Sequence, residues 1–206
     1  MRALSVKDLE FQGIIPYMNR MKDLSLHFGT HILDVGCAKG RMSSIIKELC
    51  HKGSIYVGYD IDEISIAQAK QKYNHKCMFY ASRDELFDHV RTYGLFDTLL
   101  FANVLHDLEK KTIEEYLHLL KKGGKVCIID HHKKGMTAQE FLSSLKDMDK
   151  EWMQKEGFET FYAKRTKINL YDCISLMASL GIDHLSSKGP LPNDYFYTYI
   201  GVKEHD

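Results

Sequence analysis

The chain has 206 residues, of which 44% are hydrophobic and 27% charged, and its 28 basic side chains equal its 28 acidic ones. This composition suits one compact domain with a sizeable core, and the even charge disfavours nucleic acid as the main partner because phosphate contacts demand a basic face. The sequence contains no run of about 18 uncharged apolar residues, so no membrane span is expected. Five cysteines without C-x-x-C spacing favour reduced thiols and a cytoplasmic location over a disulfide framework.

Short strand-like and helix-like stretches alternate between residues 30 and 130. The combinations Ser82-x-x-Glu85 and Thr112-x-x-Glu115 are capping boxes, which predict helix starts. Alternation of this kind is typical of parallel βαβ units joined by right-handed crossovers. The strands are predicted at 30–35, 54–60, 76–81, 96–105 and 123–130.

The rhythm changes after the fifth strand. Residues 133–168, with a capping box at Thr137, predict a helical insertion or lid. Asn169 is predicted to cap the last helix, and the stretches GIDHLSS and DYFYTYIGVK predict an antiparallel pair that closes the sheet. We therefore expect a single α/β domain over residues 1–206, in which residues 1–28 form an N-terminal covering segment.

The stretch ILDVGCAKGRMS at 32–43 is the main functional signal. A strand, a glycine-bearing turn and a helix place backbone N–H groups at the carboxyl edge of a sheet. A phosphate-binding P-loop is excluded because no Gly-Lys pair stands at the required offset, and a dinucleotide fingerprint starting at Gly36 would find Ala38 and Arg41 where it needs glycine. Asp34 would repel a pyrophosphate, whereas it suits a cationic ligand such as an ammonium or a sulfonium.

The sequence DVGCAKG resembles the D-x-G-x-G-x-G motif of class I S-adenosylmethionine-dependent methyltransferases. Asp34, Gly36 and Gly40 match, and Ala38 replaces the middle glycine. The resemblance implies S-adenosylmethionine as cofactor, S-adenosylhomocysteine as product, and a Rossmann-like doubly wound sheet of seven strands, mostly parallel with an antiparallel last strand. It also implies that Asp34 orients the methionyl end, while the loop through Cys37 approaches the cofactor closely.

Further motifs of this family follow in order over roughly residues 30 to 130. YVGYDID resembles the second motif, in which the acid, here Asp60, binds both ribose hydroxyls. FYASRDEL and FDTLLFANVLHDL resemble the third and fourth motifs. The remaining cofactor contacts that the resemblance implies are Ile61 on the adenine, Ser82, Arg83 or Asp84 at the adenine edge, and Asn103 and Val104 beside the sulfonium.

The end of the fourth strand indicates the kind of acceptor. NVLHDL lacks the [DN]-P-P-[YF] motif of enzymes that methylate planar amide or adenine nitrogens, and it nearly matches the V-L-H-H-L of a small-molecule branch resembling quinone-biosynthesis methyltransferases. His106 is therefore the first candidate for a base or an acceptor-orienting group, followed by His131 and His132. Tyr17 and Trp152 are candidates for acceptor contacts, Tyr17 in the covering segment and Trp152 in the insertion.

Imidazole and carboxylate groups near Asp130 also suit divalent cations. Adjacent residues of a strand point to opposite faces, however, so His131 and His132 are not expected to chelate together and no metal is predicted. The predicted function is methyl transfer to an O, N, S or C atom of a small molecule, by a monomer or homodimer. The alternatives are a methyltransferase acting on tRNA or protein and a catalytically silent protein that binds S-adenosylmethionine.

Overall fold

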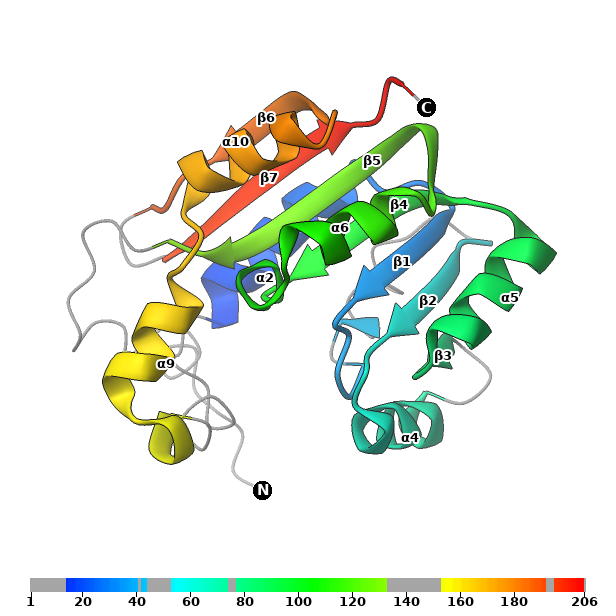
Figure 1. Cartoon of the computed structure of the whole chain (residues 1–206), viewed down its shortest axis with the longest axis horizontal. Coiled ribbons are helices and arrows are strands. Elements are labelled where there is room, and N and C mark those ends of the chain that lie inside the picture. Colours follow the sequence, from blue (N-terminus) through cyan, green and yellow to red (C-terminus); the bar gives the residue numbers. More distant parts are fainter. Residues whose placement is uncertain are drawn as a thin grey trace.

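Seven strands form one mixed sheet in the order β3-β2-β1-β4-β5-β7-β6 (Figure 1). The structure is a computed structural model, and it describes residues 14–40, 42–43, 53–73, 77–132, 153–191 and 195–205. The strands are β1 (His31–Val35), β2 (Ile55–Tyr59), β3 (Met78–Tyr80), β4 (Phe96–Ala102), β5 (Leu120–His131), β6 (Asp183–Lys188) and β7 (Phe196–Val202).

Strands β1 to β5 are parallel, and β7 runs antiparallel to both β5 and β6. The predicted α/β fold with a mostly parallel sheet and an antiparallel end is therefore confirmed. Ala102 of β4 pairs with Ile129 of β5, so the chain leaves both strands at neighbouring points of the carboxyl edge. That edge is where ligands bind in open α/β sheets.

Helices cover both faces of the sheet (Figure 1). Apolar residues of α5, α6 and α10 share one core cluster with Leu33 and Val35 of β1, whereas α2 and α4 share a second cluster with Ile32. This division follows from the alternation of side chains along a strand. The helices are α2 (Ile14–Ser25), α4 (Glu63–Lys72), α5 (Arg83–Tyr93), α6 (Lys110–Leu117), α9 (Phe158–Arg165), α10 (Leu170–Ser179) and the 3-10 turn η1 (Leu105–Asp107).

Two of the predicted helix caps are confirmed. Ser82 accepts a hydrogen bond from the backbone of α5 in a complete capping box, and Asn169 does so for α10. The predicted box Thr112-x-x-Glu115 is wrong, because α6 already begins at Lys110 after the N-cap residue Glu109. Thr112 thus lies inside the first turn, where its own backbone is helical.

Several predictions concern residues outside the described ranges. They include the cap at Thr137, the first part of the insertion and Trp152, whereas the end of the insertion forms α9 beside η1 (Figure 1). Among the described residues, no helix has both the length and the apolar character needed to cross a bilayer.

Candidate functional site

The loop after β1 has the backbone geometry that its glycines require. Gly36 has φ +70, and a Cβ atom there would lie 2.4 Å from Cγ2 of Val104. Glycine is therefore needed both for the left-handed backbone and for the close contact with the chain that follows β4. Ala38, which replaces the middle glycine of the motif, also has a positive φ of 46°. The loop thus keeps the shape of a three-glycine turn with alanine at one position.

Asp60 is fixed beside this loop. Its Oδ2 accepts a hydrogen bond from the backbone N–H of Ala38 at 2.8 Å, and its Oδ1 accepts one from Asp62 at 2.9 Å. A carboxylate has about four acceptor positions, so two such bonds orient Asp60 and leave capacity for hydroxyl groups. The adjacent Ile61 has a side chain that is 81% exposed. An oriented acceptor and an open apolar side chain therefore stand next to each other at the end of β2.

Asp34 is fully buried and accepts a short hydrogen bond from the hydroxyl of Tyr56. Burial, with the charge of Asp34 adding to it, raises the pKa of Tyr56 well above its ordinary value, so the phenol keeps its proton. Gly58 lies opposite Asp34 in the strand register, and Tyr56 precedes it by two residues on the same face. The sequence analysis did not identify Tyr56, whose only signal was a polar group on a buried strand.

Cys37 is buried within the cofactor loop. Burial, with Asp34 and Asp60 adding to it, raises the pKa of the Cys37 thiol far above its ordinary value. The thiol therefore stays protonated and donates to the Ala38 carbonyl oxygen at 3.6 Å. This environment gives Cys37 the character of a small packing residue in the loop after β1.

Ser82 and Arg83 stand at the start of α5 and differ in their contacts. The Ser82 hydroxyl accepts the Glu85 backbone N–H at 3.2 Å, and Ser82 lines a hollow of about 310 Å³ between α4 and α5. Arg83 instead forms an ion pair with Glu115 of α6 at 2.6 Å. Ser82 therefore borders an open space, whereas the ion pair with Glu115 directs the Arg83 side chain toward α6.

Asn103, the first residue after β4, is in a strained conformation. Its φ is 58°, a region that non-glycine residues seldom adopt, and its N–H donates to the Ile129 carbonyl at 2.8 Å. Its side-chain oxygen is buried and has no hydrogen-bond partner among the described residues. A strained backbone that carries an unsatisfied buried acceptor beside Val104 is typical of a ligand site.

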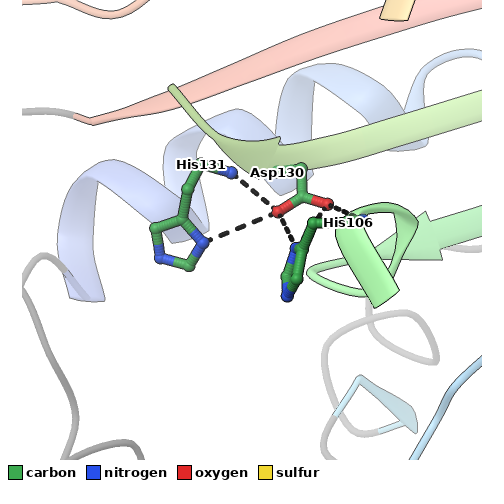
Figure 2. A group of neighbouring side chains, drawn as sticks. All are labelled: His106, Asp130 and His131. Carbon is green, nitrogen blue, oxygen red and sulfur yellow. Dashed lines mark hydrogen bonds and ion pairs between the residues drawn. The ribbon is translucent and has the colours of Figure 1, made fainter. Parts of the chain in front are cut away.

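The chain beyond β4 meets the end of β5 in a histidine–carboxylate pair (Figure 2). Nδ1 of His106 lies 2.7 Å from Oδ1 and 2.9 Å from Oδ2 of Asp130, and the His106 backbone N–H donates to Oδ2 at 3.3 Å. Both side chains are buried, with 2% of His106 and none of Asp130 exposed. The pair is therefore shielded from bulk water, which strengthens its electrostatic interaction.

His131 belongs to the same group. Its backbone N–H donates to Oδ1 of Asp130 at 2.8 Å, and its Nδ1 lies 3.6 Å from that oxygen. Its ring packs 4.8 Å from that of Phe196, and Phe196 packs 5.0 Å from Tyr17. The structure thus brings His106 and His131 together and places Tyr17 one ring further away, with its hydroxyl 3.5 Å from Sδ of Met42.

Two pKa shifts follow from this arrangement. Burial alone would raise the pKa of Asp130, but the hydrogen bonds and charge that His106 and His131 supply outweigh it and hold that pKa well below its usual range. Burial lowers the pKa of His131 below its ordinary value, although the neighbouring Asp130 opposes the shift. Asp130 is therefore a carboxylate at every pH near neutrality.

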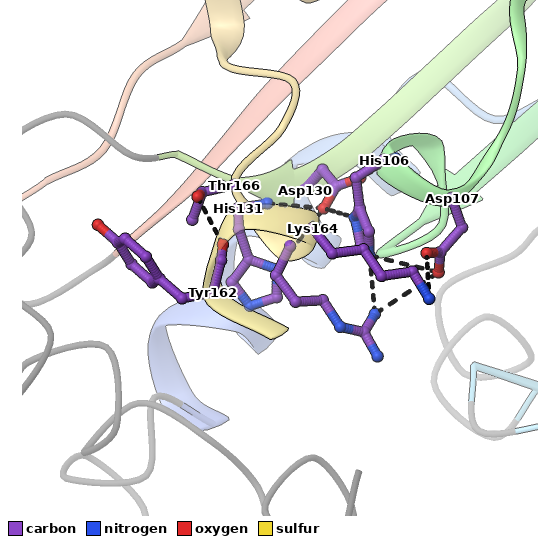
Figure 3. A network of polar contacts seen from close by, with 8 residues as sticks. His106, Asp107, Asp130, His131, Tyr162, Lys164 and Thr166 are labelled. Atoms are coloured by element: carbon purple, nitrogen blue, oxygen red, sulfur yellow. Dashed lines mark hydrogen bonds and ion pairs between the residues drawn. The ribbon is translucent and has the colours of Figure 1, made fainter. Parts of the chain in front are cut away.

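Arg165, the last residue of α9, contacts Nε2 of His106, which is the ring nitrogen away from Asp130. Its Nη1 is 2.8 Å from Nε2 of His106. Because a guanidinium only donates, Nε2 is the acceptor and the ring proton is assigned to Nδ1, which faces Asp130. Asp107 lies 3.4 Å from Nε2 of His106 and pairs with Lys164 at 3.2 Å (Figure 3). The sequence analysis did not identify Arg165 or Asp107, because nothing in the pattern placed α9 against η1.

His132 is directed elsewhere. Its Nδ1 accepts the backbone N–H of Leu170 at 3.4 Å, at the start of α10, and its ring lies 6.3 Å from that of Tyr197. The structure therefore does not bring His132 together with His106, although strict alternation along β5 would place His132, and not His131, on the face of Asp130.

Comparison with known proteins identifies the class. Residues 26–178 match a family model described as a methyltransferase domain, which covers most of the chain. The chain therefore belongs to this family of methyltransferase domains.

Individual relatives are distant. The ribosomal protein L11 methyltransferase of Thermotoga neapolitana is 26% identical over 141 residues, which are 68% of this chain and 47% of that protein. This chain thus spans about half the length of that curated relative. Among solved structures, the plantazolicin methyltransferase BpumL in complex with S-adenosylhomocysteine has a TM-score of 0.67 at 15% identity, covering 96% of this chain and 86% of that one. The magnesium protoporphyrin IX methyltransferase of Synechocystis PCC 6803 has a TM-score of 0.61 at 16% identity, covering 98% and 90%. These two likenesses establish the fold.

Proposed function

We propose that this methyltransferase methylates a small molecule whose acceptor atom lies beside His106 and Asp130. The observation that carries the proposal is the buried pair itself, with 2.7 Å between Nδ1 of His106 and Oδ1 of Asp130 at the carboxyl edge of β4 and β5. The resemblance of VLHDL to the small-molecule branch that includes quinone-biosynthesis methyltransferases supports the same acceptor class.

The cofactor would lie against the loop after β1. Gly36 and Gly40 allow close approach of the backbone, and Asp60 would accept the two ribose hydroxyls. Asn103 offers an unsatisfied buried oxygen on the sulfonium side, while Asp34, held by Tyr56, contributes negative charge near the methionyl end. The other proposed cofactor contacts are Cys37, Ala38, Ile61, Val104, Ser82 and, less directly placed, Arg83.

The bound cofactor supplies a methyl group on a sulfonium, an electrophile that is already activated. The protein's own task is then to align the acceptor and, where necessary, to remove its proton. Asp130 keeps the His106 proton on Nδ1, so Nε2 is the nitrogen that would receive a proton from the acceptor. Arg165 lies on Nε2 at 2.8 Å, and the acceptor would have to displace it. His131 and Tyr17 would border the acceptor, and His132 would hold the start of α10.

The first test is calorimetric titration with S-adenosylhomocysteine, with NAD as the control ligand. We expect wild-type protein to bind S-adenosylhomocysteine and not NAD, and Asp60→Ala to weaken that binding more than about tenfold, since hydrogen bonds to a charged group contribute roughly 1.5–3 kcal/mol. Unchanged affinity in Asp60→Ala would refute the ribose assignment. Turnover of a panel of phenols, amines and thiols, lost in His106→Ala with S-adenosylhomocysteine binding intact, would then support the acceptor assignment.

Protein methylation is a second candidate, because the relative at 26% identity is named as a ribosomal protein methyltransferase. Labelled S-adenosylmethionine incubated with ribosomal proteins distinguishes the two. Transfer of label to a protein, with no turnover of the small-molecule panel, would replace the first proposal by the second.

A further inference from the structure

We propose that His106, Asp130 and His131 form a binding site for a divalent transition-metal ion at the carboxyl edge of β4 and β5. Each residue offers one ligand atom, and these atoms all lie within 4.8 Å of one another. His131 is the last residue of β5, whereas His106 lies in η1 beyond β4, and Figure 2 shows both rings beside the Asp130 carboxylate. The sequence analysis considered imidazole and carboxylate ligands near Asp130 but predicted no metal, and only the structure shows that His106 and His131 approach the same carboxylate.

The distances suit a common ion. In a tetrahedral zinc site with bonds of about 2.0–2.1 Å, two ligand atoms lie roughly 3.3 Å apart. Nδ1 of His106 lies 2.7 Å and Nδ1 of His131 lies 3.6 Å from the same oxygen, Oδ1 of Asp130. These two values lie on either side of the tetrahedral spacing. All three ligand atoms lie within 4.8 Å of one another, so they would have to move closer together around a bound ion.

The chemistry of the ligands points to a transition metal. Two imidazoles and one carboxylate favour zinc, iron, cobalt or manganese, whereas magnesium and calcium prefer oxygen ligands. Three protein ligands leave at least one coordination position open, which is the arrangement of catalytic zinc sites. Asp130 is fully buried, so its negative charge lacks solvent and would be well matched by a cation.

A bound ion would change the contacts of His106. Coordination through Nδ1 requires the ring proton to move to Nε2, and Arg165 could then no longer donate to that nitrogen. Asp107, whose Oδ2 lies 3.4 Å from Nε2, is placed to accept a hydrogen bond from the Nε2–H group instead. Metal-bound histidines usually donate their other N–H to such a carboxylate. Metal binding and the Arg165 contact are therefore mutually exclusive.

The ion would act on the acceptor. An acceptor oxygen in the open position would be oriented toward the methyl group, and its hydroxyl would have a lowered pKa and would release its proton to solvent water more readily. Nε2 of His106 carries the ring proton in the metal-bound state, so His106 would act as the base only in the metal-free protein. This role depends on the proposed function, whereas the binding site itself does not.

The test measures metal binding directly. Protein stripped with a chelator is titrated with Co²⁺, whose absorption reports coordination by nitrogen ligands, and with Zn²⁺ by calorimetry. We expect one ion per chain, with affinity reduced about 100-fold or more in Asp130→Asn and in His131→Gln, because removal of a ligand exceeds the 10- to 100-fold effect of removing a supporting residue. His118→Gln, at an exposed histidine at the end of α6, is the matched control and should bind as wild type does.

Two further variants test the predicted exchange of partners. Arg165→Ala should bind the ion more tightly, since the competing guanidinium is gone, and Asp107→Asn should bind it about tenfold more weakly. Loss of Zn²⁺ binding in the ligand variants is interpreted only where S-adenosylhomocysteine still binds, which shows that the variant has folded. His106→Gln replaces Asp130→Asn if the latter does not fold.

Failure of wild-type protein to bind either ion stoichiometrically would overturn the metal site. Binding that persists in both Asp130→Asn and His131→Gln would overturn it as well. If S-adenosylhomocysteine binds normally in either case, the proposed methyltransferase function is unaffected. Absence of S-adenosylhomocysteine binding together with stoichiometric Zn²⁺ binding would leave the metal site and remove the cofactor assignment.

Discussion

Nδ1 of His106 donates to Oδ1 of Asp130 over 2.7 Å, although 24 residues separate them in the sequence. The intervening chain forms α6 and most of β5, and it returns Asp130 to the strand end that His106 follows. Because β4 and β5 pair in parallel, with Ala102 opposite Ile129, the contact results from the sheet register. This buried histidine–carboxylate hydrogen bond has measurable consequences.

The first prediction concerns the coupling within this pair. His106→Leu leaves the buried carboxylate of Asp130 without its main partner, and we expect the free energy of unfolding to fall by about 3 kcal/mol. The double variant His106→Leu/Asp130→Leu should be less destabilised than the sum of the two single variants, because no uncompensated charge remains. Urea unfolding of the four proteins measures the coupling. Strictly additive changes would show that the two side chains do not depend on each other.

Two further buried histidines, His31 and His89, are hydrogen-bonded to each other at the amino end of β1. Nδ1 of His31 donates to the Leu95 carbonyl at 3.2 Å, so its Nε2 accepts from Nε2 of His89 at 2.8 Å. Nδ1 of His89 in turn accepts from the Tyr80 hydroxyl at 3.1 Å. In this series of hydrogen bonds, every donor has an acceptor only when both imidazole rings are neutral.

The second prediction is a loss of stability in mild acid. Burial and the neighbouring His31 lower the pKa of His89 from 6.5 to about 4. As the pH falls from about 6.5 to about 4, the unfolded chain therefore binds a proton that the folded chain does not, and stability decreases across this window. The contribution is fully present above pH 6.5. Urea midpoints measured between pH 7.5 and 4 should fall less steeply in His89→Phe than in wild type, and equal slopes would count against the assignment.

The third prediction contrasts two positions of the cofactor loop. Gly36→Ala would place a Cβ atom 2.4 Å from Val104 at a φ of +70, so we expect destabilisation and loss of S-adenosylhomocysteine binding. Ala38→Gly removes the strain of a non-glycine residue at a φ of 46°, but it also increases the conformational freedom of the unfolded chain. These two effects on the free energy of unfolding have opposite signs and, at about 1 kcal/mol each, nearly cancel. Calorimetry and thermal unfolding measure both variants. Equal effects of the two substitutions would contradict this account of the loop.

The fourth prediction concerns the hydrogen bond between Tyr56 and Asp34. Tyr56→Phe removes a donor to a buried carboxylate, which is expected to cost roughly 1.5–3 kcal/mol of stability. Since Asp34 precedes the cofactor loop, affinity for S-adenosylhomocysteine should fall as well. Tyr199→Phe, a buried tyrosine on β7, serves as the control and should leave that affinity unchanged. A loss of stability without any loss of affinity would mean that Tyr56 serves packing alone.

The sequence predicted local backbone features better than contacts between residues far apart in the chain. Gly36, Asp60 and Asn103 follow three separate strands, and their spacing is set by local turns whose backbone geometry the residue types reveal. The helix start at Ser82 was predictable for the same reason, since a capping box is a contact within one turn. The prediction at Thr112 was wrong because the Thr-x-x-Glu spacing can also occur inside a helix, and α6 begins two residues before Thr112.

The sequence by itself determined the order of strands and helices, the parallel character of the sheet and the glycine-bearing turn after β1. These depend on periodicity and on turns, which act over a few residues. Only the tertiary structure decided that His131 joins His106 while His132 turns to Leu170, and that Arg165 of α9 lies on Nε2 of His106. Such contacts join residues far apart in the chain, and they depend on how strands pair and helices pack rather than on local preference.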